Sequence, residues 1–399
     1  MPQYGKNDPK ATLGVRRRSC YHPHRDINLC RHGWACSRLL LGSQEKGAQR
    51  IPAFDLARKA NEKMTEKVTI LDHIGNTPLL KLGHVTDSLG VDIFVKCEFT
   101  NPGGSIKDRM ALCMIEEAEK RGELKPGGTI VDQSTGNTGP ALSFVGNVKG
   151  YKVQIFLPAQ LSSSYDSADR IRIAQLYGAN VTPIDLNEHM ENADRLQGVE
   201  RAATFVAIRM KQAYDLQQSD PSNWWANQLC NVDNTRAHRE FTGREILEQM
   251  DGQIDGWVAS VGTGGTLLGV AQTLKEKHPE LKVAGVVPTD DPRIEWVRSR
   301  AVHKALEKFG GPKLRFLIED ILEGNVMDDE ITIENADAKK MADRLCQEEG
   351  LFCGMSSGAN VCAAIQMAKT MKKGSKIVTV IVDRRDRYFA EYPNEHYVV

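Results

Sequence analysis

The sequence predicts an α/β protein in which mainly parallel sheets are covered by helices. From about residue 68 to residue 383, short apolar runs alternate with segments whose apolar residues recur at helical spacing. Helices between apolar strands are typical of parallel sheets, because each crossover helix covers the sheet that it rejoins. With 399 residues, of which 41% are hydrophobic, the chain is long enough to form two domains.

Six apolar runs are the clearest strand candidates. Polar, glycine-containing loops follow several of them, and sheets of this kind bind ligands at the carboxyl ends of their strands. We therefore look for function in three loops. The predicted strands are residues 93–96, 128–131, 152–157, 257–261, 283–287 and 376–382.

The first loop presents one lysine at the start of a helix. It reads Asn-Pro-Gly-Gly-Ser-Ile-Lys-Asp-Arg over residues 101–109, and Ser105 is a candidate cap for the helix that follows. Lys107 would lie in the first helical turn, where the helix dipole and partial desolvation disfavour its charged form. A neutral amine is what a covalent bond to an aldehyde needs. A single lysine near a helix start is more often an ordinary surface residue, so this loop alone decides nothing.

The second loop has the composition of a phosphate site. Glycines let backbone N–H groups approach an anion, and threonine hydroxyls add donors at a helix start. The loop is neither a P-loop, since it has no Gly-Lys-Ser/Thr, nor a dinucleotide fingerprint, since Leu267 replaces the third glycine. It therefore predicts a single phosphate, bound by Gly262, Thr263, Gly264, Gly265 and Thr266.

The third loop, residues 133–139, collects hydroxyl and amide groups before a helix that we expect to open at Pro140. Such groups can hold a carboxylate. Each loop by itself is more often a plain turn. Together, the lysine, the phosphate loop and the carboxylate loop describe an amino acid held on pyridoxal phosphate.

Five motifs of this chain resemble, in their order, those of cysteine synthase and cystathionine β-synthase, which are pyridoxal-phosphate enzymes of fold type II. The resemblance covers about residues 66–390. Its motifs are Ile-Gly-Asn-Thr-Pro-Leu at 74–79, the Lys107 segment, Ser-Thr-Gly-Asn-Thr-Gly at 134–139, the loop at 262–266, and Gly-Met-Ser-Ser-Gly-Ala at 354–359.

The resemblance implies a role for each site residue. Lys107 would bind the cofactor covalently and act in catalysis, Asn137 would contact its 3′-hydroxyl, and residues 262–266 would bind its phosphate. Ser356 would accept the pyridine nitrogen, although a helix cap is an alternative role for this serine. The residues expected to bind the substrate are Ser134, Thr135, Gly136, Thr138 and Gln228.

The same resemblance implies two domains with the cofactor in the cleft between them. Residues 65–98 and 232–399 would form the larger, cofactor-binding domain, and residues 99–231 a smaller, mobile domain that holds the substrate carboxylate. A homodimer is also expected.

The implied reaction is β-replacement, in which O-acetylserine and sulfide give cysteine and acetate through an aminoacrylate intermediate. The segment around Gln228 is similar to that of cysteine synthases, whereas cystathionine β-synthases usually have a tyrosine there. Gln228 could bind the substrate carboxylate or be an ordinary amide. Two alternatives stay open: a cystathionine β-synthase that uses serine and homocysteine, and a catalytically weak relative that binds a partner or senses sulfide.

One segment departs from the family pattern. Family members usually carry a Gly-Ile-Gly loop that faces the substrate, whereas residues 318–324 of this chain read Ile-Glu-Asp-Ile-Leu-Glu-Gly. The loss of small residues leaves the shape of the pocket for the sulfur nucleophile open.

Charge and cysteine content limit the partners and the location. Formal net charge is zero, with 52 basic and 52 acidic side chains, so neither nucleic acid nor a membrane surface is expected as a partner. No apolar run approaches the roughly 20 residues that cross a membrane. The nine scattered cysteines suggest reduced, intracellular use and a cytoplasmic protein.

Residues 1–64 have a different composition, with Arg16-Arg17-Arg18 and little periodicity. A disordered or targeting extension is one interpretation, and a transit peptide would make the protein mitochondrial. A natural start at Met64 is another. A third is a metal or haem site, for which we assign no ligand because no local motif matches. Its candidate residues would be Cys20, His22, His24, Cys30, His32 and Cys36.

Overall fold

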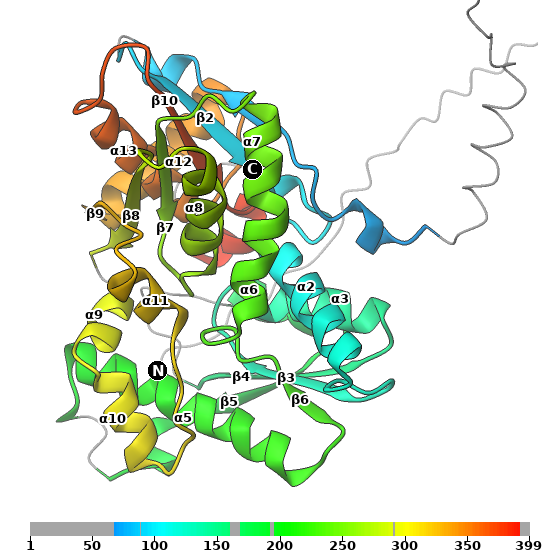
Figure 1. Ribbon diagram of the computed structural model, residues 1–399. Helices are drawn as coiled ribbons and strands as arrows, with labels where there is room; N and C mark the ends of the chain where they lie inside the picture. The colour runs from blue at the N-terminus through cyan, green and yellow to red at the C-terminus, as the bar shows by residue number, and fades with distance from the viewer. Residues whose placement is uncertain (1–67, 88, 160–167, 192–194, 290–291, 392–399) are drawn as a thin grey trace, which may run out of the picture. The chain divides into compact units, whose positions relative to one another are not determined.

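The computed structural model describes residues 68–87, 89–159, 168–191, 195–289 and 292–391 (Figure 1). The predictions for residues 1–64, including the six cysteine and histidine candidates and the start at Met64, lie outside the described residues.

A six-stranded sheet forms one part of the described unit. Its strand order is β1-β2-β10-β7-β8-β9, and β1 pairs antiparallel with β2 while the other neighbours pair parallel. The prediction of a mainly parallel sheet is confirmed. The strands are β1 (Leu79–Lys81), β2 (Asp92–Cys97), β7 (Gly256–Ser260), β8 (Lys282–Pro288), β9 (Asp329–Ile333) and β10 (Lys376–Ile381).

A four-stranded sheet forms the other part, and Figure 1 shows the two sheets well separated from each other. Its order is β5-β4-β3-β6, and all of its pairs are parallel. The strands are β3 (Thr129–Gln133), β4 (Lys152–Pro158), β5 (Asn180–Ile184) and β6 (Asn223–Trp225).

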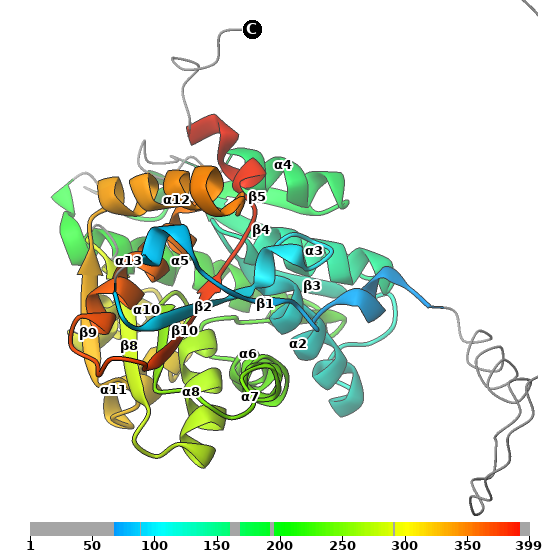
Figure 2. The same ribbon diagram turned by 90° about the horizontal axis from the view of Figure 1, so that it is seen from above.

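Helices cover both sheets (Figure 2). In the six-stranded part, α13 packs on β10 and beneath α12, and α8 packs against β7. In the four-stranded part, α3 and α5 contact β4 and β3. The α-helices are α2 (Lys107–Arg121), α3 (Thr138–Val148), α4 (Ala168–Leu176), α5 (Gly198–Ser219), α6 (Val232–Ala237), α7 (Gly243–Gln249), α8 (Gly265–Lys277), α9 (Arg293–Arg298), α10 (Ala301–Lys308), α11 (Leu317–Glu323), α12 (Asn335–Glu349) and α13 (Met355–Ala368).

Short helical turns join these elements. A π-helical stretch, His238–Thr242, links α6 to α7. The 3₁₀ segments are Ile70–His73, His84–Thr86, Glu98–Thr100, Leu186–Glu188 and Arg385–Glu391.

Helix α2, which begins at Lys107, shows why these residues form this element. Its buried residues Met110, Met114 and Ala118 recur at helical spacing and share one face. It ends at Gly122, whose φ of 71° lies in the left-handed region that glycine adopts without cost. The face that α2 buries against α3 and α6 fixes the direction in which its first turn points.

Helices α9 and α10 pack against α5 (Figure 1). By sequence they belong to the predicted larger domain, whereas α5 belongs to the predicted smaller one. The division into residues 65–98 with 232–399 and residues 99–231 stays a prediction. If the smaller domain moves, α5 must either slide against α9 and α10 or move together with them.

A buried network of ion pairs joins α2, β2 and α7. Arg109 donates to Glu98 at 2.7 and 2.9 Å and to Glu245 at 2.6 and 2.7 Å. Lys96, fully buried on β2, donates to the other side of the network at Glu245, 2.6 Å away. Charge-assisted, bidentate pairs of this kind are strong, and their geometry is fixed by the planar guanidinium.

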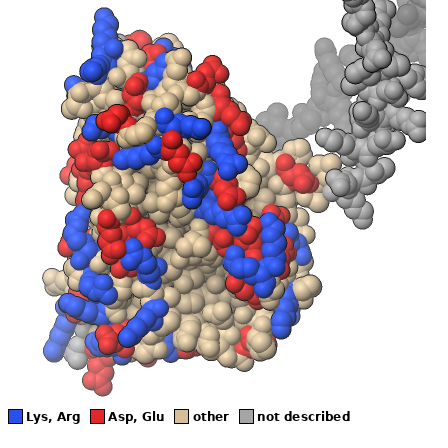
Figure 3. Space-filling view, viewed as in Figure 1, with Lys and Arg blue, Asp and Glu red and all other residues tan. Residues whose placement is uncertain are grey.

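In the view of Figure 3, basic and acidic side chains intermingle on the surface, and neither sign of charge forms a large patch. None of the described helices is long and apolar enough to cross a membrane.

We expect Glu245→Ala to destabilise the apoprotein by about 3–5 kcal/mol, because it leaves Lys96 and Arg109 buried without their shared counter-charge. The pairing lowers the pKa of Glu245 from 4.5 to about 2, against the opposing effect of its burial. Its contribution is therefore present above pH 4.5 and is lost as the pH falls through about 2. Urea unfolding at neutral pH measures the loss. Glu348→Ala, which removes an exposed pair with Arg344, is the control and should change stability far less. Equal effects of the two substitutions would show that the network contributes little.

Candidate active site

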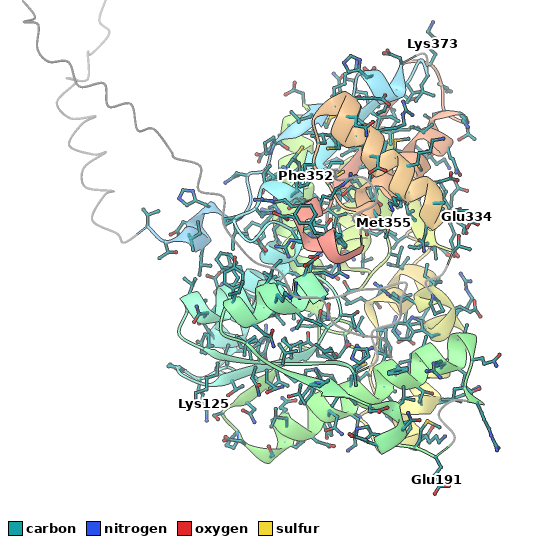
Figure 4. The ribbon with its side chains drawn as sticks, turned by 180° about the vertical axis from the view of Figure 1, so that it is seen from behind. Lys125, Glu191, Glu334, Phe352, Met355 and Lys373 are labelled. Atoms are coloured by element: carbon teal, nitrogen blue, oxygen red, sulfur yellow. The ribbon has the colours of Figure 1, made fainter. Side chains whose placement is uncertain are left out.

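One cavity of about 270 Å³ collects almost all residues that the sequence singles out. Figure 4 shows one of its lining residues, Met355, between the end of the unit that holds Lys125 and Glu191 and the opposite end that holds Lys373. Gly265 is the one predicted site residue that does not line it. The predicted residues that do are Lys107, Ser134, Thr135, Gly136, Asn137, Thr138, Gln228, Gly262, Thr263, Gly264, Thr266 and Ser356.

The Lys107 amine points into this cavity without a hydrogen-bond partner among the described residues. Desolvation in the cavity and the nearby positive charge of Arg293 lower the pKa of Lys107 from 10.5 to about 8, although Asp383 acts in the opposite direction. At neutral pH about a tenth of the side chain is then uncharged, far more than for a lysine in water. Among the described residues that line the cavity, Lys107 is the one lysine, and its amine is partly uncharged at neutral pH.

The structure corrects how this lysine is presented. Ile106, not Ser105, is the residue that caps α2, and it makes no side-chain cap. The Ser105 hydroxyl instead accepts a 3.3 Å hydrogen bond from the Lys107 backbone N–H. The backbone of Ser105 forms an isolated antiparallel β-bridge with Asp383, which follows β10. The lysine loop is therefore attached to the end of a central strand.

The loop at 262–266 follows β7 and opens α8, as predicted. Gly264 has a φ of 95°, a conformation that side-chain-bearing residues rarely adopt. The Thr263 hydroxyl accepts from the Asn234 amide at 2.9 Å, and the Thr266 hydroxyl lies 3.1 Å from His238. Backbone N–H groups at the start of a 13-residue helix can hold a phosphate.

The two adjacent glycines of this loop serve packing as much as anion binding. A Cβ on Gly265 would lie 2.3 Å from the Asn234 side-chain oxygen, and one on Gly264 would lie 3.1 Å from Ile321. Both would meet protein rather than the cavity.

The carboxylate loop is held by Gln228. Its amide oxygen accepts from the Thr138 hydroxyl at 2.5 Å, and its amide nitrogen donates to the Gln133 carbonyl at 2.8 Å. Ser134 turns its hydroxyl inward and accepts from the N–H groups of Gly136 and Gly139. Gln228 is buried and lines the cavity, so it fixes the loop whether or not it also touches a substrate.

The helix after this loop begins at Thr138, so Pro140 is its third residue and not its first. The N–H groups of the first three helical positions are unpaired in any helix, which is why proline is still tolerated here.

Asn137 is oriented by two residues that the sequence did not single out. It donates to the Asp383 carboxylate at 2.5 Å and accepts from the Arg387 guanidinium at 3.0 Å. Tyr388 also donates to Asp383. Burial raises the pKa of the Asp383 carboxyl, while these hydrogen bonds oppose the shift.

Ser356 is exposed to the cavity at the second position of α13, and Gly354 occupies the cap position. The alternative role of Ser356 as a helix cap is therefore wrong.

Residues 318–324 do not form a loop facing the cavity. Most of the segment lies in α11, which buries Ile318 and Ile321 behind the phosphate loop. The cavity is shaped instead by α5 and α9, which contribute Val206, Arg209, Arg293 and Trp296.

Sequence reasoning missed three arginines of the cavity: Arg170 on α4, Arg209 on α5 and Arg293 on α9. Each stands in an amphipathic or irregular segment where an arginine is normally solvated, and no local pattern distinguishes it. Within the described ranges, no group of three or more histidine, cysteine, aspartate or glutamate side chains is arranged to hold a metal.

A reactive lysine, backbone donors at a helix start and a polar loop around one cavity fit pyridoxal phosphate bound to an amino acid. Fold and site thus define a pyridoxal-phosphate enzyme. The chain belongs to the pyridoxal-phosphate dependent enzyme family, whose model matches residues 70–383. Its two helix-covered sheets are those of fold type II.

Sequence similarity to known proteins indicates which pyridoxal-phosphate enzymes this chain resembles. The chain is 36% identical over 330 residues to a cysteine synthase of Staphylococcus aureus (strain Mu50 / ATCC 700699), covering 82% of this chain and 97% of that protein. It is 33% identical over 332 residues to cystathionine beta-synthase of Rattus norvegicus, covering 83% of this chain and 56% of that protein.

Among solved structures, an O-acetylserine dependent cystathionine beta-synthase from Helicobacter pylori matches with a TM-score of 0.66 and 27% identity, over 81% of this chain and 97% of that one. The chain is a pyridoxal-phosphate enzyme of the cysteine synthase and cystathionine β-synthase type.

We expect Gly264→Ala to weaken binding of pyridoxal phosphate, because alanine is strained at a φ of 95° by about 1–3 kcal/mol and the loop must distort to relieve it. Gly136→Ala is the matched control, since nothing lies within 4 Å of the added Cβ and its φ is not positive. Equilibrium titration of both apoproteins with the cofactor gives the affinities. An affinity of Gly264→Ala equal to that of Gly136→Ala would place the phosphate outside this loop.

Proposed function

We propose that this protein replaces the β-substituent of O-acetylserine with sulfide, giving cysteine and acetate. The observation that carries the proposal is the unpartnered Lys107 in one cavity with the phosphate loop and the carboxylate loop. The similarity to cysteine synthase over most of both chains supports the choice of reaction.

The proposal gives each group of cavity residues a role in the reaction. Bound pyridoxal phosphate delocalises the electrons left on Cα when its proton is removed. Lys107 binds the cofactor, takes the Cα proton once substrate has displaced it, and returns the proton after the sulfur has added. The phosphate loop would hold the phosphate of the cofactor, and Asn137, oriented by Asp383 and Arg387, would contact its 3′-hydroxyl. Ser356 faces the ring nitrogen.

The carboxylate loop orients the substrate. Ser134, Thr135, Gly136 and Thr138 bind the α-carboxylate, and Gln228 keeps the loop in shape through its hydrogen bonds to Thr138 and Gln133. Correct orientation aligns the Cα–H bond with Lys107, which lowers the barrier to proton removal.

Cystathionine β-synthase activity is the second candidate, with serine or a serine ester and homocysteine as substrates. The similarity to the rat and Helicobacter pylori proteins favours it. Gln228 favours the first candidate, because it fills the position where cystathionine β-synthases usually have tyrosine. A weakly catalytic, sulfide-sensing relative is the remaining alternative, and the lowered pKa of Lys107 argues against it.

We also propose a cytoplasmic homodimer whose residues 99–231 close over the bound substrate. Sedimentation equilibrium tests the dimer, and imaging of the full chain in cells tests the location. Slower proteolysis of this segment in the presence of substrate would support closure.

We expect Lys107→Ala to lose covalent attachment of the cofactor, since no other lysine lines the described cavity. In the wild-type apoprotein, attachment should accelerate as the pH rises through about 8, because only the uncharged amine reacts. Borohydride reduction followed by mass spectrometry identifies the modified residue. Modification of another lysine in the mutant would overturn the assignment.

A substrate panel decides between the candidates. We expect the holoenzyme to turn over O-acetylserine with sulfide at least tenfold more efficiently than serine with homocysteine, as judged by kcat/KM. The reverse order would favour cystathionine β-synthase. Absence of turnover with all four donor and nucleophile combinations would favour the sensing alternative.

A further inference from the structure

The described residues that line the cavity carry four positive charges and no carboxylate: Lys107, Arg170, Arg209 and Arg293 stand among them without an aspartate or glutamate. In the proposed function, Lys107 is consumed by the bond to the cofactor. The cofactor phosphate and the substrate α-carboxylate bind to backbone N–H and hydroxyl groups of two loops. The guanidinium of Arg209 therefore remains to be explained.

Arg209 has the least compensated charge, because its guanidinium is buried and its terminal nitrogens lack a protein partner among the described residues. Only 5% of its surface is exposed, and among the described residues its one hydrogen bond runs from Nε to the Phe205 carbonyl at 3.1 Å. Both terminal nitrogens of its guanidinium have no protein partner in the described ranges. A buried charge without a counter-charge is costly, so such a group is normally paired.

A second arginine, Arg293, lies close to Arg209. Arg293 and Trp296 stand one turn apart on α9, and Val206 and Arg209 stand one turn apart on α5. The two helices pack together, so all four side chains line the same wall of the cavity. Burial and the charge of Arg293 lower the pKa of Arg209 to about 10, which leaves it protonated at neutral pH.

We propose that Arg209, with Arg293 beside it, forms an anion subsite for the part of a reactant that lies beyond Cβ. The ligand is a carboxylate, phosphate or sulfo group, carried either by the leaving group of the donor or by the sulfur nucleophile. Guanidinium groups bind such oxyanions through paired N–H donors. The inference rests on the proposed β-replacement as a reaction type, and it names an anionic reactant in place of either O-acetylserine or sulfide.

The step itself balances in either case. The Cβ–O bond of the serine ester breaks, and its electron pair leaves with the released phosphate or carboxylate. The thiol loses its proton, and its sulfur forms the new bond to Cβ. Lys107 removes and returns the Cα proton, so no oxidant or reductant is needed.

Comparing an anionic reactant with a neutral one of the same kind tests the subsite in the holoenzyme. The donor arm compares O-phosphoserine with O-acetylserine, both with sulfide. The nucleophile arm compares mercaptoacetate with mercaptoethanol, both with O-acetylserine, because the two thiols are similar in size and differ in charge. The arm in which the wild type prefers the anionic reactant identifies which reactant carries the anion. No preference in either arm would overturn the proposal.

Arg209→Met should then lower kcat/KM for the preferred anionic reactant by roughly 10- to 100-fold, mainly through KM, and change the neutral reactant less than threefold. Arg209→Lys should retain part of the preference. Lys211→Met removes a partly exposed charge, paired with Asp215, from the same helix and should leave every value unchanged. Arg293→Met is a second variant and should weaken the same preference, whether or not Arg209→Met folds.

Two measurements separate this proposal from its alternatives. Calorimetric titration of the holoenzyme with mercaptoacetate or inorganic phosphate should show binding that Arg209→Met weakens. If Arg209→Met instead lowers affinity for pyridoxal phosphate and leaves the reactant preference intact, Arg209 neutralises the cofactor and the proposal fails. Turnover of O-acetylserine with sulfide tests the β-replacement independently, since neither reactant carries an anionic group bonded beyond Cβ.

Discussion

The ion-pair network around Arg109 fixes the part of the chain on which the chemistry depends. Lys107 stands two residues before Arg109, in the first turn of α2. Arg109 grips Glu98 at the end of β2 and Glu245 on α7, so the start of α2 is fixed to two other elements. The pairs are short and buried, which makes them strong and directional. Without these ion pairs, the same loop sequence would not hold the Lys107 side chain in one direction.

The cavity lies where strand ends from both sheets meet. β3 ends at the carboxylate loop, β7 ends at the phosphate loop, and β10 ends beside Asp383, which orients Asn137. Parallel strands bring their carboxyl ends to one edge, so groups that are distant in sequence converge without any special local motif. Hydrogen bonds from Gln228, Asn234 and His238 then hold the loops from behind.

Residues 318–324, where the family pattern has small residues, do not line the cavity. Because this segment folds into α11 and packs against Gly264, it supports the phosphate loop instead of facing substrate. Helices α5 and α9 line the cavity instead. These helices place Arg209 and Arg293 together, which gives the cavity a charge that the family resemblance did not suggest.

The sequence by itself determined six of the ten described strands, the mainly parallel pairing and the three loops, because hydrophobic periodicity and glycine placement are local properties. Residue types and spacing singled out Lys107, the loop at 262–266 and the loop at 133–139, whereas the roles of Asn137 and Ser356 came from the family resemblance. Tertiary structure decided everything that depends on burial or on partners distant in the chain. Arg209, Arg293, Asp383 and Tyr388 carry no local signal, since an arginine or aspartate is ordinarily solvated. Only the packing of α9 on α5, and of the chain after β10 on Asn137, removes them from water and turns them toward the site.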